Sequence, residues 1–405
     1  MAPKDRSANG ADQREAGRTQ VLAVIRKAGQ IARIDIAQET GVSPATVTAL
    51  TSELLAAGLI EEVAPDIEKP AGRGRPRVAL RLRGAAHLIA GLKVSHSTLS
   101  VTLVDFEGIT QHEHTAAMPG HKITAQALID IIHRTLSDVQ RHLGKDLSGL
   151  SGIGLGMAGV IDAPKGFVHW SPSLTDRNIQ LREMLEQSLS LPIFIDNDAN
   201  LVAKAEQLFG EGRGVKDFIV VTIEHGVGMG IVIDGQIYRG TRGCGAEFGH
   251  TKVHLDGALC RCGQRGCLEA YVADYALLRE AQLSEPVGNL SPEDQLTQLF
   301  LAAKAGDSTA QSIFNRAGRM FAMGLANIVN IFDPKLIILS GERMQFDYLY
   351  ADEVIAAMMA LVVQVDAPPP EVRIHRWGDL MWARGAAAYG IEGVTDLAVR
   401  MMADA

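Results

Sequence analysis

Two apolar strand pairs of the same design, about 130 residues apart, are the feature that most limits how this chain can fold. Each pair is followed by helical segments that alternate with further buried strands. The strands are expected at 88–94, 99–105, 152–156, 218–223, 230–233 and 336–340, and the long helices at about 124–142 and 307–332. Because each hairpin must bury its faces against helices, the repeat predicts an α/β protein with a two-lobed, actin-like fold and a cleft between the lobes.

The size of the chain fits more than one domain. It has 405 residues, 47% of them hydrophobic and 21% charged, which is ordinary for a globular protein of two or three domains. The first twenty residues lack the apolar stretch of a signal peptide. The sequence contains no uninterrupted run of about 18 apolar residues, the length needed to span a bilayer. We therefore expect a cytoplasmic protein with no membrane insertion.

Charge is distributed unevenly along the chain. Residues 1–83 hold 13 basic and 10 acidic side chains, whereas the whole chain carries a formal net charge of −8. Within that first part, the segment Lys69 to Arg83 (KPAGRGRPRVALRLR) has six basic residues and no acidic one. A basic module on an acidic body is typical of a regulator that contacts DNA with one part and senses a ligand with another. A solvated basic loop is the plainer interpretation of the charge alone.

The N-terminal module reads as three short helices. Apolar residues recur at helical spacing over 17–28, a second helix fits 33–40, and a third begins at Pro44 with Ser43 as its N-cap. The third helix would turn Val47, Leu50 and Leu54 inward. Its outer face would carry the small and hydroxylated residues Ala45, Thr46, Thr48, Ala49 and Thr51. Such a face lets a helix enter a major groove deeply.

Two short strands, near 59–63 and 77–82, flank a loop rich in glycine, proline and arginine. Three helices followed by such a hairpin make a winged helix-turn-helix. The arginines of the loop suit the negative potential of a narrow minor groove. The expected DNA contacts are therefore Ser43, Ala45, Thr46, Thr48, Ala49, Arg73, Arg75 and Arg77. A small helical domain that serves protein contacts is the alternative.

Three of the four cysteines lie together in the string Cys260-Arg-Cys262-Gly-Gln-Arg-Gly-Cys267. A disulfide across a CxC pair is strained, and cytoplasmic thiols are kept reduced. Three clustered thiolates favour a divalent metal with one more ligand, for which His250 and His254 compete. Four protein ligands would make such a zinc ion structural. Reduced cysteines without a metal are the alternative, and Cys244 would be a free buried thiol.

Two carboxylates flank this string. Glu247 precedes His250 by three residues, and Glu269 follows Cys267 by two. An ordered metal loop would hold both in fixed positions, where carboxylates suit the vicinal hydroxyls of a sugar.

These motifs resemble the ROK family of repressors and sugar kinases, from Arg18 nearly to the end of the chain. The likeness rests on Glu247-Phe-Gly-His250, the CxCGxxGCxE string, Ile195-Asp-Asn197-Asp198-Ala-Asn, Tyr238-Arg-Gly240-Thr-Arg-Gly243 and Gly156-Met-Ala-Gly159-Val-Ile-Asp162. It is closest to the repressor branch, which includes the N-acetylglucosamine, glucose and xylose repressors.

The resemblance implies a site for each ligand. Sugar contacts would be Asn197, Asp198, Glu247, His250 and Glu269, with Gly159 in the sugar-cradling loop. A structural zinc would be held by His250, Cys260, Cys262 and Cys267, which leaves out His254. The family also implies a homodimer or homotetramer on a palindromic DNA operator.

Two departures from the family's kinases bear on activity. Where ROK kinases carry a DxGGT-type turn, this chain reads Lys93-Val-Ser95-His96-Ser97, and the second phosphate turn reads Glu224-His225-Gly226. A carboxylate beside a triphosphate is repulsive, and the lost glycines prevent close approach of the backbone. We therefore expect no kinase activity.

The resulting expectation is a DNA-binding regulator, most simply a repressor, of carbohydrate genes, controlled by a sugar bound between two lobes. The alternatives are a ROK sugar kinase with a fused DNA-binding module and a regulator gated by a protein partner. The expected domains are a disordered tail over 1–16, the winged helix over 17–84, a first lobe over 85–196 completed by about 384–405, and a second lobe over 197–383.

Overall fold

The structure is a computed structural model. It describes residues 6–64, 78–95, 97–144, 146–223, 226–241, 243, 245–282, 290–341, 344, 346–349, 352–363, 368–376 and 380–403. The chain divides into two compact units, Met1–Asp196 together with Trp382–Ala405, and Asn197–Met381. The boundaries expected from the sequence lie at 196/197 and near 384.

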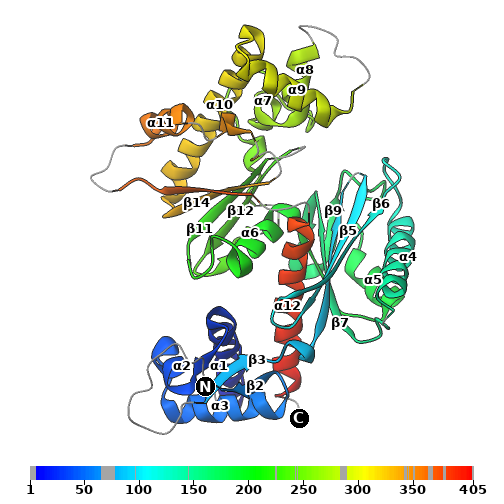
Figure 1. Ribbon diagram of the computed structural model, residues 1–405, viewed down its shortest axis with the longest axis vertical. Helices are drawn as coiled ribbons and strands as arrows, with labels where there is room; N and C mark the ends of the chain where they lie inside the picture. Colours follow the sequence, from blue (N-terminus) through cyan, green and yellow to red (C-terminus); the bar gives the residue numbers. More distant parts are fainter. Residues whose placement is uncertain are drawn as a thin grey trace, which may run out of the picture. The chain divides into compact units, whose positions relative to one another are not determined.

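The first unit begins with the winged-helix module (Figure 1). Its elements are α1 (Arg6–Ala28), β1 (Ile31–Ala32), α2 (Arg33–Thr40), α3 (Pro44–Ala56), β2 (Ile60–Val63) and β3 (Ala79–Leu82). The strands form a sheet in the order β1-β3-β2. Helix α1 starts well before the predicted helix at 17, because the preceding segment has no proline and several good helix formers. Over residues 6–16 the structure therefore differs from the expected disordered tail.

The α/β part of the first unit is built on a five-stranded sheet in the order β10-β7-β4-β5-β6. Its elements are a 3₁₀ turn (Gly84–Ala86), β4 (Leu88–Val94), β5 (Thr98–Asp105), β6 (Thr110–Ala117), α4 (Ala125–Leu143), β7 (Leu150–Met157), β8 (Val160–Asp162), a 3₁₀ turn (Ala163–Lys165), β9 (Phe167–Trp170), α5 (Leu181–Leu189), β10 (Ile193–Asn197) and α12 (Met381–Met401). Strand β4 pairs antiparallel with β5 and parallel with β7. The predicted hairpin is thus formed by β4 and β5, which are inner strands of the sheet.

Helix α12 packs directly on this sheet because the sheet offers glycine where the helix crosses it. A Cβ on Gly91 of β4 would lie 2.0 Å from the Ala383 carbonyl oxygen. One on Gly154 of β7 would lie 1.8 Å from the Ala386 carbonyl oxygen. Such distances are far inside van der Waals contact, so only glycine allows the helix backbone to lie this close.

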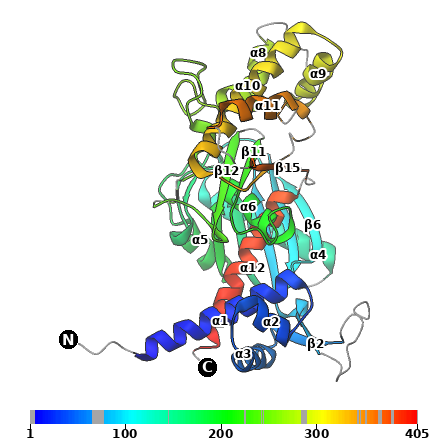
Figure 2. The ribbon, with the colours of Figure 1, turned by 90° about the vertical axis from the view of Figure 1, so that its left-hand side faces the viewer.

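The far end of α12 contacts the winged-helix module (Figure 2). The Arg18 side chain of α1, which is 6% exposed, pairs with Glu53 of α3 and lies 3.5 Å from the Val399 carbonyl oxygen. Arg26 of α1 donates to the Phe106 carbonyl oxygen at 3.0 Å and stacks on the Phe106 ring. Burial lowers the pKa of Arg26 to about 10. The winged-helix module is therefore attached to the α/β part of its unit by one buried and one half-buried arginine.

The second unit repeats the hairpin design in a sheet ordered β13-β12-β11-β14-β15 (Figure 1). Its elements are α6 (Asp198–Phe209), β11 (Phe218–Ile223), β12 (Val227–Ile233), β13 (Gln236–Ile237), a 3₁₀ turn (Phe248–His250), α7 (Glu269–Val272), α8 (Asp274–Gln282), α9 (Pro292–Lys304), α10 (Ser308–Phe332), β14 (Leu336–Ser340), a 3₁₀ turn (Asp347–Leu349), α11 (Asp352–Leu361) and β15 (Glu371–His375). Strand β11 pairs antiparallel with β12 and parallel with β14. The two units therefore share one plan, a hairpin extended by parallel strands.

None of the helices within the described residues is long and apolar enough to cross a membrane.

Candidate functional site

Helix α3 presents the face that the sequence assigned to DNA. Ser43 caps the helix by accepting a hydrogen bond from the Thr46 amide at 3.2 Å, and Pro44 is the first helical residue. Val47, Leu50 and Leu54 are buried, whereas the predicted DNA contacts Ser43, Ala45, Thr46, Thr48 and Ala49 are all exposed. The exposed face contains no acidic side chain in its first two turns, so it can approach phosphates without repulsion.

Thr51, the fifth residue expected on that outer face, is wrongly placed by the sequence pattern. It is fully buried, and its hydroxyl accepts a hydrogen bond from Arg33 Nε at 3.1 Å. Arg33 also pairs with Glu62 of β2. Thr51 therefore fastens α3 to the rest of the module, because its position on the helix borders the inward stripe.

The predicted wing contacts Arg73, Arg75 and Arg77 lie outside the described residues. The strands on either side of them, β2 and β3, pair antiparallel from Ile60 with Leu82 to Val63 with Ala79.

The predicted metal ligands come together in the second unit. One donor atom from each of His250, Cys260, Cys262 and Cys267 lies within 4.8 Å of the others. Cys260 Sγ is 3.7 Å from His250 Nδ1, and Cys262 Sγ is 3.7 Å from Cys267 Sγ. A tetrahedral zinc ion with bonds of about 2.3 Å to sulfur sets its sulfur ligands about 3.7 Å apart. The four side chains thus fit a structural metal ion.

The rival histidine named by the sequence is separate from this cluster. The rival ligand His254 is exposed and lies outside the cluster, with its ring against Tyr271. Cys244 lies outside the described residues. Burial raises the pKa of the Cys260 thiol to about 12, so a metal that binds there must displace a firmly held proton.

Lys252, which the sequence did not single out, completes the charge of the metal loop. Its ammonium lies 2.9 Å from Cys267 Sγ and donates to Gln264 Oε1 at 2.6 Å. The hydrogen bond with the Cys267 sulfur raises the pKa of Lys252 above its usual value. A zinc ion bound by three thiolates would carry one net negative charge, which Lys252 would offset. No motif announces a single lysine of this kind.

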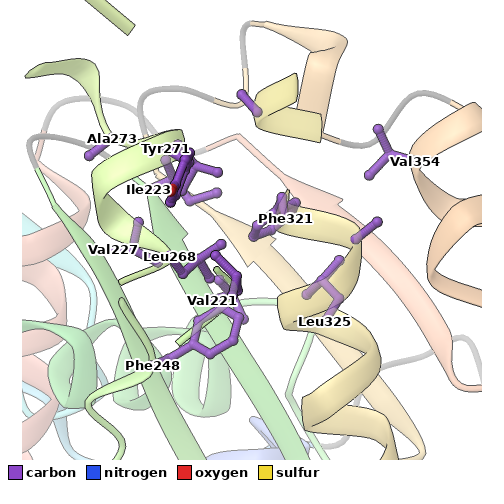
Figure 3. Close-up of a cluster of buried hydrophobic side chains, with 14 of the residues drawn as sticks. Val221, Ile223, Val227, Phe248, Leu268, Tyr271, Ala273, Phe321, Leu325 and Val354 are labelled. Carbon is purple, nitrogen blue, oxygen red and sulfur yellow. The ribbon is translucent and has the colours of Figure 1, made fainter. Parts of the chain in front are cut away.

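The loop residues are positioned by buried neighbours. Phe248, beside Glu247, and Leu268, between Cys267 and Glu269, are both buried in the core of the second unit. Figure 3 shows them close to Val221 of β11. The Phe248 ring and the Leu268 side chain both pack against Gly324 of α10. Full burial of each contributes about 1.5–3 kcal/mol, so the polar residues next to them are held on a firm base.

Two of the predicted sugar contacts of the second unit, Glu247 and Glu269, lie close to the His250 and cysteine cluster. Glu247 Oε2 lies 4.0 Å from His250 Nε2, and Glu269 Oε1 lies 3.6 Å from Cys260 Sγ. Burial raises the pKa of Glu247; the charge of His250 opposes this rise, and those of Asp198 and Glu269 add to it. The Glu247 side chain is nevertheless 49% exposed, so a ligand can reach it. The arrangement offers several strong acceptors for the hydroxyl groups of one small molecule.

Asn197 and Asp198 stand where β10 ends and α6 begins. Asn197 caps α6 by accepting a hydrogen bond from the Ala199 amide at 2.9 Å. The pair is therefore fixed at a strand-to-helix turn, which is the usual place for ligand-binding side chains in α/β folds.

Gly159 belongs to the first unit, in the turn between β7 and β8. Its φ is 134°, and a Cβ there would lie 2.2 Å from the Trp170 carbonyl oxygen. The backbone of this turn therefore requires glycine, whatever else the turn does.

The turn that departs from the sequence of the family's kinases begins at Lys93, near the end of β4. Lys93 is 7% exposed, and its ammonium lies 4.4 Å from the centre of the Trp382 ring of α12. His96, Glu224 and His225 lie outside the described residues.

Comparison with known proteins agrees with this fold. The ROK family matches residues 89–392, and a winged helix-turn-helix DNA-binding family matches residues 18–61. The class is thus a DNA-binding winged helix joined to a sugar-kinase-like α/β domain, and the chain belongs to the ROK family. The predicted fold class and family are confirmed.

Individual relatives include repressors and a kinase. A xylose repressor from Caldicellulosiruptor bescii is 30% identical over 82% of this chain and 84% of its own length. A solved ROK family transcriptional regulator, described as a homologue of the E. coli Mlc protein, has a TM-score of 0.81 at 25% identity and covers 96% of this chain and 99% of its own. A ROK glucokinase from Streptomyces griseus, solved with glucose and AMPPNP, has a TM-score of 0.62 at 29% identity over 75% of this chain and 99% of its own.

Proposed function

We propose that this protein is a transcriptional repressor of carbohydrate genes, whose affinity for DNA is controlled by a sugar and which has no kinase activity. The observation that carries the proposal is the meeting of Glu247, His250 and Glu269 on a metal loop, in a chain that also bears a DNA-reading helix. The similarity to a xylose repressor over 82% of this chain supports the same class of function.

Zinc is proposed as a structural ion held by His250, Cys260, Cys262 and Cys267, since this donor set and its spacing suit that ion. The proposed sugar contacts are Asn197, Asp198, Glu247, His250 and Glu269, with Gly159 in the loop of the first unit. In this repressor Asp198 acts as a hydrogen-bond acceptor that orients the sugar. The arginines Arg73, Arg75 and Arg77 are proposed as minor-groove contacts, and a dimer or tetramer as the DNA-bound form.

The proposal that the chain is not a kinase is supported by Lys93. A catalytic carboxylate of the family's kinases is replaced by a cation that lies on Trp382, deep in the first unit. Phosphoryl transfer depends almost entirely on positioning and charge neutralisation around the phosphates. A site that has lost its metal-binding carboxylate lacks the means for both.

The energy needed for control is within reach of a sugar. A hundredfold preference for one state of the protein corresponds to about 2.7 kcal/mol. Two charge-assisted hydrogen bonds to carboxylates, at about 1.5–3 kcal/mol each, supply that difference.

A thermal-shift series with D-xylose, D-glucose, N-acetylglucosamine and ATP tests the ligand class. At least one sugar is expected to raise the unfolding temperature, and ATP is expected to have no effect. At a hundred times its Kd, such a sugar adds about 2.7 kcal/mol to the free energy of unfolding. Glu247→Gln should abolish the shift, whereas Glu113→Gln on strand β6 should keep it. Stabilisation by ATP with phosphorylated product would support a kinase, and silence with every sugar would favour control by a protein partner.

Ala49→Glu tests the DNA-reading face. A carboxylate at this exposed position of α3 would face phosphates, so affinity for a duplex selected from a random library should fall at least about 100-fold. Ala56→Glu, the same change at the other end of α3, is the matched control and should bind nearly as well as the unaltered protein. An equal loss in both variants would remove Ala49 from the DNA-binding face.

A further inference from the structure

Helix α8 holds the metal loop through two side chains that no motif predicted. Arg279 donates to the Leu259 carbonyl oxygen at 3.1 Å and to the Ala270 carbonyl oxygen at 2.8 Å. The Tyr275 ring lies 4.0 Å from the Arg261 guanidinium and 6.0 Å from that of Arg279. Tyr275 is therefore fixed between two cations, with its hydroxyl at the base of the loop.

The Tyr275 hydroxyl lies between a metal ligand and a proposed sugar contact. It is 3.3 Å from Glu269 Oε1 and 3.6 Å from Cys260 Sγ, and it accepts from the Arg261 amide at 3.5 Å. A tyrosine has one proton to donate, so Glu269 and Cys260 compete for it. The other oxygen of Glu269 lies 3.4 Å from the Val227 amide, which keeps the carboxylate oriented.

The state of the metal site changes this competition. A Cys260 thiol can donate its own proton to Glu269 Oε1, which lies 3.6 Å away. A metal-bound thiolate has no proton and can only accept. In the metal-loaded protein the hydroxyl of Tyr275 is thus shared between two anionic acceptors.

We propose that Tyr275 is a positioning residue that couples the metal site to sugar binding. Its hydroxyl does so by directing its hydrogen bond either to Glu269 or to Cys260. This inference rests on the proposed function, because it takes Glu269 as a sugar contact. When a sugar hydroxyl donates to Glu269, the Tyr275 proton turns to the Cys260 sulfur. Sugar affinity and the metal–sulfur bond then depend on each other, as linked equilibria must.

Cobalt in place of zinc makes the metal–sulfur bond visible. In the full-length protein loaded with Co²⁺, a hydrogen bond to Cys260 lowers the energy of the sulfur electrons and moves the sulfur-to-cobalt absorption band to higher energy. Glu269→Ala removes the competing acceptor, so it should shift the band to higher energy in the unaltered protein. In a Tyr275→Phe background this shift should nearly disappear.

Tyr271→Phe is the matched control. The Tyr271 hydroxyl also supports the loop, by accepting from the Ala258 amide at 2.8 Å, and within the described contacts it bonds neither Cys260 nor Glu269. The Glu269→Ala shift should persist in a Tyr271→Phe background. Equal shifts with and without Tyr275, or a Tyr271→Phe variant that suppresses the shift equally, would overturn the proposal.

Calorimetry with D-xylose, D-glucose and N-acetylglucosamine gives the second measurement. Tyr275→Phe is expected to weaken the sugar that binds by about tenfold, or about 1.4 kcal/mol, with one metal ion retained per chain. An unchanged Kd would contradict the coupling. If none of these sugars binds the unaltered protein, the proposed effector fails, while the cobalt series still decides the role of Tyr275.

Tyr275→Leu, which also lacks the hydroxyl, guards against misfolding of the first variant. Loss of cobalt from both variants would make Tyr275 a purely structural residue and would overturn the proposal.

Discussion

Cys262→Ser is expected to empty the metal site and abolish sugar binding. Cys262 is exposed, so the change removes a ligand with little loss of packing. Losing an outer contact of a metal site alone costs about 10–100-fold in affinity, and loss of a direct ligand should exceed about 100-fold. Without the ion, the metal bonds that order the loop of His250 and Cys260 are lost, and Glu269 loses a fixed neighbour at Cys260. Metal content after dialysis and calorimetry with the active sugar measure the two effects.

Leu255→Ser is the matched control for the cysteine change. Leu255 belongs to the same loop and is 80% exposed, and it is not among the clustered ligands. This variant should keep one metal ion per chain and its sugar response. A Cys262→Ser protein that retains its full metal content would exclude Cys262 from the ligand set.

Gly154→Ala is expected to destabilise the first unit by at least about 3 kcal/mol, the upper part of the range for overpacked cores. The new Cβ would lie 1.8 Å from the Ala386 carbonyl oxygen, and the obstacle is backbone that cannot turn aside. Helix α12 would have to move off the sheet, together with the Val399 carbonyl that Arg18 of the winged helix reaches. Calorimetry should show a fall of about 6–12 °C in the unfolding midpoint.

Gly149→Ala separates this clash from the general effect of replacing a glycine. A Cβ on Gly149 would meet no atom within 4 Å. The variant should change stability by less than about 1 kcal/mol. If both alanine variants unfold at the temperature of the unaltered protein, the close contact between α12 and the sheet is refuted.

The sequence predicted the regular elements well where burial leaves a strong pattern. The strand expected at 88–94 is β4, that at 218–223 is β11, and that at 336–340 is β14. Strand β6 was missed, because its side chains alternate between half-buried and exposed and none is buried. Helix α12 was missed as well. Its small residues pack against glycines of a sheet that lies far away in sequence, and this partner leaves no local pattern.

Some residues of the candidate site could be predicted from the sequence and others could not. The clustering of His250 with the cysteines could be predicted, because ligand types at close spacing carry a signal of their own. Thr51 was misplaced because helical periodicity alone does not reveal its partner Arg33. Lys252 and Tyr275 act through single contacts with the loop, and one lysine or tyrosine in a sequence carries no pattern.

The first unit is assembled from both ends of the chain, and this sets the order in which it can be completed during synthesis. The second unit is one continuous segment, Asn197–Met381, and all of it leaves the ribosome before α12 does. Until then the glycine face of the sheet is bare and Arg18 lacks its contact at Val399. The DNA-reading module therefore gains its contact with α12 only when this last helix is made. A nascent or prematurely ended chain has a winged helix that lacks this support.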